Sequence, residues 1–76
     1  MNISGVLVKA YPQHILSIEK TLATMAGVEV HGNNADGRIV ITVEDKSANN
    51  ISDTLVQIQG VHGVLSAAMI YHQFED

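Results

Sequence analysis

The four histidines are the side chains of this sequence best suited to proton transfer or metal binding: His14, His31, His62 and His72. No two of them stand four residues apart on an expected helix, and no HExxH pattern is present, so their spacing predicts no metal site. The chain has no cysteine, which excludes thiolate metal sites, disulfides and iron–sulfur clusters. No Ser/His/Asp or Cys/His arrangement can be argued either. We therefore predict that the protein is not an enzyme and carries no cofactor.

The charge of the chain excludes a further class of function. The net charge is −4, with only four Lys and Arg residues in total. Nucleic-acid binding depends on clustered cations that contact phosphates, so we predict no nucleic-acid partner. An acidic chain is better suited to a basic ligand or peptide. The N-terminus lacks the basic segment and apolar run of a secretory signal, so we expect a cytoplasmic protein that does not insert into a membrane.

Hydrophobic periodicity predicts six elements that position these groups. Strands are expected at 3–10, 28–31, 38–44 and 63–72, and the first helix at 13–26. Pro12 suits the first turn of that helix, and Gly27 suits a left-handed cap at its end. Ser47 is expected to cap a second helix that ends at Gly60. Residues 73–76 are expected to form a short polar tail.

The order of these elements is βαββαβ, and the two halves of the sequence echo one another. This is the pattern of a single ferredoxin-like domain covering residues 1–76. Right-handed connections then place both helices on one face of a four-stranded antiparallel sheet with the strand order 4-1-3-2. The other face of the sheet is left open to solvent.

Strict alternation along each strand predicts which side chains occupy the open face. In the last strand it places Leu65, Ala67, Met69 and Tyr71 toward the helices. The edge strand 28–31 would contribute Glu29 and His31 to the open face. The predicted binding residues are those of the other strands on this face: Ile3, Gly5, Leu7, Lys9, Val40, Thr42, Glu44, Ser66, Ala68, Ile70 and His72. They form an apolar floor with an acidic rim. The acidic residues Asp45, Glu75 and Asp76 are also expected to belong to this rim. An open apolar sheet face is typical of a partner-binding surface.

The pattern alone leaves the partner open. Ferredoxin-like domains also use this face to form homodimers, so a small dimeric regulatory or ligand-sensing module is the alternative function. A peptide ligand could also add as an extra strand to the free edge of strand 28–31.

Four segments of the sequence carry a family resemblance. ISGVLVKA at 3–10, GVEV at 27–30 and GRIVITVE at 37–44 are general to the fold, and the ending VHGVLSAAMIYHQ at 61–73, followed by acidic residues, is more specific. With these segments the sequence resembles the NapD family along nearly its whole length.

The resemblance implies a function. NapD proteins are cytoplasmic chaperones of the molybdenum-containing catalytic subunit of the periplasmic nitrate reductase. They bind its twin-arginine signal peptide, which is basic at one end and apolar along its middle, as a helix on the open sheet face. Binding delays export until cofactor insertion and folding are complete. The implied partner is that signal peptide. Whether the protein also forms a weak homodimer is left open by the sequence.

Overall fold

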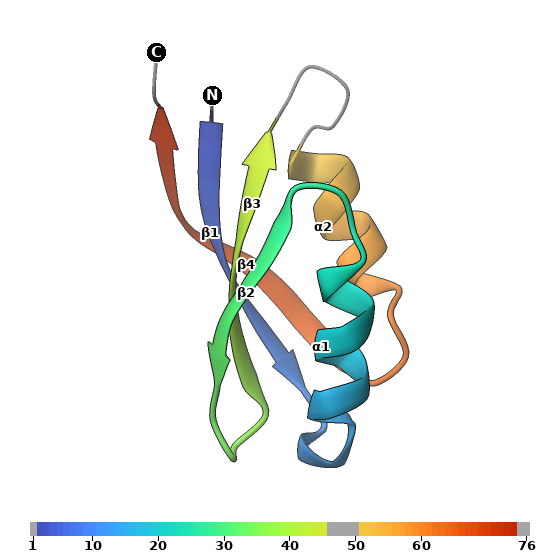
Figure 1. The fold of residues 1–76 in the computed structure, drawn as a ribbon. Coiled ribbons are helices and arrows are strands. Elements are labelled where there is room, and N and C mark those ends of the chain that lie inside the picture. The colour runs from blue at the N-terminus through green and yellow to red at the C-terminus, as the bar shows by residue number, and fades with distance from the viewer. Residues whose placement is uncertain (1, 46–50, 75–76) are drawn as a thin grey trace.

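The computed structural model describes residues 2–45 and 51–74 and confirms the βαββαβ order (Figure 1). The strands are β1 (Asn2–Ala10), β2 (Val28–Asn33), β3 (Arg38–Asp45) and β4 (Val64–Phe74). The helices are α1 (Ile15–Ala23), which follows a 3-10 turn at Pro12–His14, and α2 (Ile51–Gln59). Within the described ranges, neither helix has the length and apolarity that crossing a bilayer requires.

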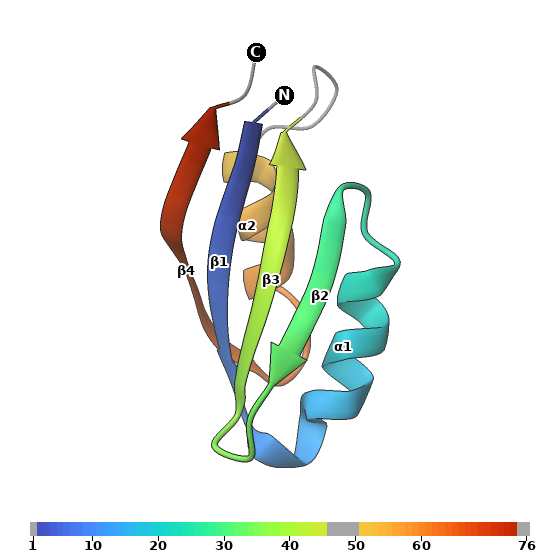
Figure 2. The ribbon, with the colours of Figure 1, turned by 60° about the vertical axis from the view of Figure 1, so that its left-hand side comes forward.

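The sheet is antiparallel throughout and has the predicted order, read as β2-β3-β1-β4 from one edge to the other. The central pair β1 and β3 is in continuous register from Asn2 opposite Asp45 to Lys9 opposite Arg38. Both helices lie on one side of the sheet, and no helix formed by residues 2–45 or 51–74 lies on the opposite side (Figure 2). We call the helix-covered side the inner face and the opposite side the outer face.

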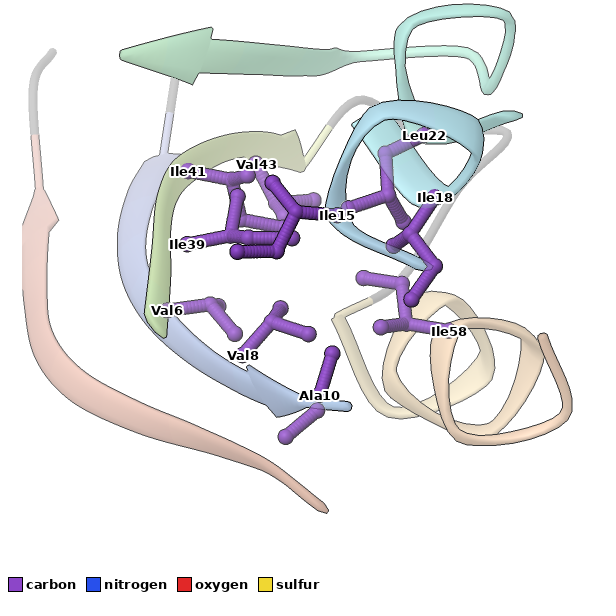
Figure 3. Close-up of a cluster of buried hydrophobic side chains, with 11 residues drawn as sticks. Val6, Val8, Ala10, Ile15, Ile18, Leu22, Ile39, Ile41, Val43 and Ile58 are labelled. Atoms are coloured by element: carbon purple, nitrogen blue, oxygen red, sulfur yellow. The ribbon is translucent and has the colours of Figure 1, made fainter. Parts of the chain in front are cut away.

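The core lies between the inner face and the two helices (Figure 3). Its members are aliphatic residues spaced at two on the strands and at three or four on α1. They are Val6, Val8, Ala10, Ile15, Ile18, Leu22, Ile39, Ile41, Val43, Ile58 and Ala67. The inward alternation predicted for β1 and β3 is therefore confirmed.

The first helix is shorter than the predicted range 13–26, because α1 ends at Ala23. Thr24 closes its last turn, since both its backbone N–H and its hydroxyl donate to the carbonyl of Thr21. Met25 then begins a tight turn in which the Val28 N–H donates to the Met25 carbonyl at 3.2 Å. Gly27 has the predicted left-handed conformation, with φ of 79°, but it serves this turn rather than capping the helix.

The ends of the other elements also differ from the prediction. β2 continues to Asn33, and β4 continues to Phe74, so Gln73 belongs to a strand instead of the expected tail. Strand pairing explains this extension, since Gln73 lies opposite Ile3 in the antiparallel ladder. The predicted cap Ser47, the acidic residues Glu75 and Asp76 and the side chain of Asp45 lie outside what the structure describes.

Two irregularities in β4 break the alternation on which the face assignment depended. Ala10 lies opposite Val64 and Lys9 opposite Ser66, which leaves Leu65 as an extra residue. Further along, Val6 lies opposite Met69 and Gly5 opposite Tyr71, which leaves Ile70 as another. Each extra residue is a β-bulge, and the strand beyond it has its faces exchanged relative to strict alternation.

The bulges make part of the β4 prediction wrong. Ala67 is buried on the inner face as predicted, but Leu65 is 57% exposed at the first bulge. Met69 shares the inner face with its neighbour Val6 and still leaves 48% of its surface exposed at this edge of the sheet. Tyr71 lies opposite Gly5 on the outer face, because the bulge at Ile70 precedes it.

The same bulge turns His72 to the inner face, so its predicted outward position is wrong. His72 lies opposite Ser4, which is fully buried on the inner face, and its Nδ1 is 3.0 Å from the Ser4 hydroxyl. The pair joins the edge strand to a central strand through side chains as well as through the backbone.

We expect Ser4→Ala to lower the free energy of unfolding by about 1 kcal/mol, the usual net worth of a hydrogen bond in a protein. Denaturant unfolding measures this loss. Ser66→Ala, at an exposed position of the same strand pair, is the control and should leave stability unchanged. Equal stability of both variants would show that the contact with His72 does not stabilise the fold.

Candidate functional site on the outer face

The outer face is a surface of small and aliphatic side chains crossing the central strands. Leu7 is at its centre, opposite Val40 on β3 and Ala68 on β4. Leu7 is half-buried, while Val40 is 41% exposed, although no element of the described chain covers either of them. An aliphatic surface of this kind, left open on a small domain, is suited to the apolar side of a partner.

Tyr71 adds an aromatic ring to this surface in a place that only glycine permits. A β-carbon built on Gly5 would collide with Cδ1, Cε1 and Cζ of the Tyr71 ring, so the ring lies directly over Gly5 of the neighbouring strand. Gly5 is buried as a result, and Tyr71 remains 49% exposed. The ring therefore extends the apolar floor from β4 across β1.

A side chain at position 5 must displace this ring, so we expect Gly5→Val to lower the free energy of unfolding by about 1–3 kcal/mol, as overpacking usually does. Gly32→Val is the matched control, because a β-carbon at Gly32 meets nothing within 4 Å. Denaturant unfolding measures the loss of stability in each variant, and the ring signals of Tyr71 in NMR spectra show whether the ring has moved. Unshifted Tyr71 signals in Gly5→Val would contradict the packing described here.

One end of the outer face is acidic. Glu44 lies opposite Ile3 near the start of β1, and Glu29 lies opposite Thr42 on the edge strand. Glu29, Thr42 and Glu44 line a shallow hollow of about 290 Å³ together with Gly27 and Val28. Two carboxylates in one hollow are suited to a guanidinium group, which carboxylates bind through charge-assisted hydrogen bonds.

The opposite end of the outer face is basic. Lys9 and Arg38 lie directly opposite each other where β1 ends and β3 begins, and both are exposed. A second hollow of about 450 Å³ lies beside them, at the β2–β3 hairpin. Its lining comprises Leu7, His31, Gly32, Asn33, Asn34, Arg38 and Val40.

Most residues predicted for the site share the outer face in the structure. They are Ile3, Gly5, Leu7, Lys9, Val40, Thr42, Glu44, Ser66 and Ala68. Ile70 is 55% exposed at the bulge and has no partner in the register of β1 and β4, while His72 is on the other face. The prediction missed Tyr71, although a glycine in the middle of a strand is a known signal of a bulge or of close approach.

The histidines do not gather into one site. The rings of His14, just before α1, and His62, between α2 and β4, are in edge contact with their centroids 5.3 Å apart. His31 Nε2 is 2.7 Å from the Thr42 hydroxyl on the outer face, as expected for an outward side chain of β2. Over residues 2–45 and 51–74, no three His, Asp or Glu side chains converge as metal ligands would.

Comparison with known proteins gives this surface a context. The NapD protein family matches residues 1–76. Chaperone NapD of Escherichia coli strain K12 is 28% identical over 75 residues, covering 97% of this chain and 86% of that protein. Chaperone NapD of Paracoccus pantotrophus is 30% identical over 73 residues, covering 96% of this chain and 64% of that protein.

The fold agrees with the sequence comparison. The solution structure of the E. coli Tat proofreading chaperone protein NapD superposes with a TM-score of 0.82 at 28% identity, covering 97% of this chain and 79% of that one. The match extends over both helices and all four strands described above, since so little of this chain is left out. This chain belongs to the NapD family.

Proposed function

We propose that this protein is a cytoplasmic chaperone that binds, on its outer face, the twin-arginine signal peptide of the catalytic subunit of the periplasmic nitrate reductase. Binding holds the precursor back from export until its cofactor is inserted and it has folded. The proposal rests on family membership together with one observation. A sheet face open to solvent combines an apolar floor with a hollow that holds two carboxylates.

The outer face has dimensions and chemistry that fit a helical peptide. Four strands spaced at about 4.8 Å give a platform roughly 15–20 Å wide, which is broad enough for a helix about 10–12 Å in diameter. Leu7, Val40 and Tyr71 offer apolar contact area to one side of such a helix. The acidic hollow receives the arginines. Ordering the peptide costs roughly 2–5 kcal/mol, so we expect an affinity that still allows release.

An NMR titration of the labelled protein with a synthetic twin-arginine signal peptide tests this proposal. We expect the largest amide shifts on β1, β3 and β4, around Leu7, Val40 and Ala68. A matched peptide with two lysines in place of the arginines should bind more weakly, because a lysine cannot form the paired hydrogen bonds that a guanidinium makes with a carboxylate.

Other outcomes point to the alternatives. Shifts confined to Val28–Gly32 would place the peptide on the free edge of β2 as an added strand. No shifts with either peptide, together with a stable dimer at micromolar concentration, would favour a dimeric regulatory module that uses the same face. Either result would overturn binding on the outer face.

A further inference from the structure

The outer face carries opposite charges at its two ends, and this polarity has a consequence for any helical ligand. Glu44 and Arg38 both point outward from β3, six residues apart. At about 3.4 Å per residue, they are separated by roughly 20 Å. Each charge has a neighbour of the same sign on an adjacent strand, Glu29 beside the acidic end and Lys9 beside the basic end.

We infer that the signal peptide binds in one direction, with its arginines at the Glu29–Glu44 hollow and its helix running along β1 toward Lys9 and Arg38. This inference rests on the proposed function and specifies the site's geometry. A helix that covers roughly 20 Å contains about 13 residues. The two arginines and the residues that follow them over this length therefore form the recognised segment.

Charge complementarity acts at both ends of the bound helix. At the start, the arginine side chains meet two carboxylates that line one hollow. At the other end, the unpaired carbonyls of the peptide helix carry partial negative charge, and Lys9 and Arg38 lie beneath them. The apolar floor between the ends contacts the middle of the peptide.

The reverse direction is disfavoured by the same groups. It would place two arginines on Lys9 and Arg38 and leave the two carboxylates facing the helix carbonyls. Like charges brought together across an interface suppress the wrong arrangement more strongly than matched charges reward the right one. The strand register therefore determines the direction of the ligand, because it places all four charges on one face.

Spin-labelled peptides test the direction. A nitroxide is attached next to the arginines in one peptide and about 13 residues later in a second, and the ¹⁵N-labelled protein is titrated with each. We expect the first label to broaden the amides of Ile3, Glu29 and Glu44, and the second to broaden those of Lys9, Arg38 and Ser66. The chain has no cysteine, so a cysteine-linked label stays on the peptide.

The outcomes separate the direction from the proposed function. Broadening in the reverse order, or equally at both ends, would overturn the inferred direction while leaving the outer face as the site. If the same two peptides without their nitroxide labels also fail to bind, the proposed function itself would be overturned.

A charge cycle supplies an independent measurement. We expect the double change Glu29→Gln and Glu44→Gln to weaken binding of the twin-arginine peptide about tenfold or more, as loss of charge-assisted hydrogen bonds does. The same protein should bind a peptide with two glutamines in place of the arginines as the unaltered protein does. Glu19→Gln is the control, because Glu19 is on α1 and its amide replacement can still accept from Asn33. An equal loss with both peptides would show that the arginines are located elsewhere.

Discussion

Leu7→Glu is expected to abolish signal-peptide binding while the protein stays folded. Leu7 is at the centre of the outer face, half-buried between Val40 and Ala68. A bound peptide would cover this position with apolar side chains, so the carboxylate would lose its water without gaining a partner. Desolvation of this kind weakens binding by about a hundredfold or more. Isothermal titration gives the affinity, and circular dichroism verifies the fold.

The control variants separate burial from charge. Leu16→Glu makes the same chemical change on α1, where the side chain is 75% exposed on the other side of the molecule, and should leave binding unchanged. Leu7→Lys should weaken binding about as much as Leu7→Glu, because desolvation rather than the sign of the charge is responsible. Unaltered affinity in Leu7→Glu would rule out the outer face as the binding surface.

Ile58→Ala is expected to cause the largest loss of stability among single changes in α2. Ile58 is fully buried, and it is the only member of the described core cluster that α2 contributes. Truncating a buried isoleucine costs about 2–5 kcal/mol, which is a large part of the 5–15 kcal/mol that stabilises a typical domain. At about 4–8 °C for each kcal/mol in a domain of this size, the midpoint of thermal unfolding should fall by about 8–40 °C.

Val56→Ala is the matched control in the same helix. Val56 is 68% exposed, two positions before Ile58, so its truncation should change the free energy of unfolding by no more than about 0.5 kcal/mol. Thermal and denaturant unfolding of both variants give the comparison. Similar losses at the two positions would show that α2 is not held to the sheet mainly through Ile58.

The inner faces of the central strands were predictable because aliphatic residues recur at every second position along them, even where the residue between two of them is also apolar. In β3, Ile39, Ile41 and Val43 are each separated by one residue, and all three are buried as predicted. The two central strands pair with each other in continuous register, whereas each edge strand has a register shift against its central neighbour. The floor of the outer face could therefore be placed from the sequence, together with the strand order and the side on which the helices lie.

The faces of Tyr71 and His72, beyond the second bulge of β4, could not be predicted, because the sequence there carries no polar–apolar alternation. Ala67, Ala68, Met69, Ile70 and Tyr71 are all apolar, so polarity does not mark which of them turn inward. The position of a bulge depends on how the edge strand bends against its neighbour, which leaves little trace in residue type. The helix end at Ala23 was missed for a related reason, since Met25 packs against the core from a turn and continues the helical spacing.

The bulge at Ile70 also bears on how this chain can change in evolution. The three residues that follow it keep their faces only as long as the extra residue is present, because Tyr71 and Gln73 lie opposite outer-face neighbours and His72 opposite an inner one. Deletion of one residue here would exchange all three at once, and a later compensating insertion would restore them. In this segment a change of length alters the outer face more than a single substitution does. Homologues that keep the same number of residues here therefore keep the same side chains on that face.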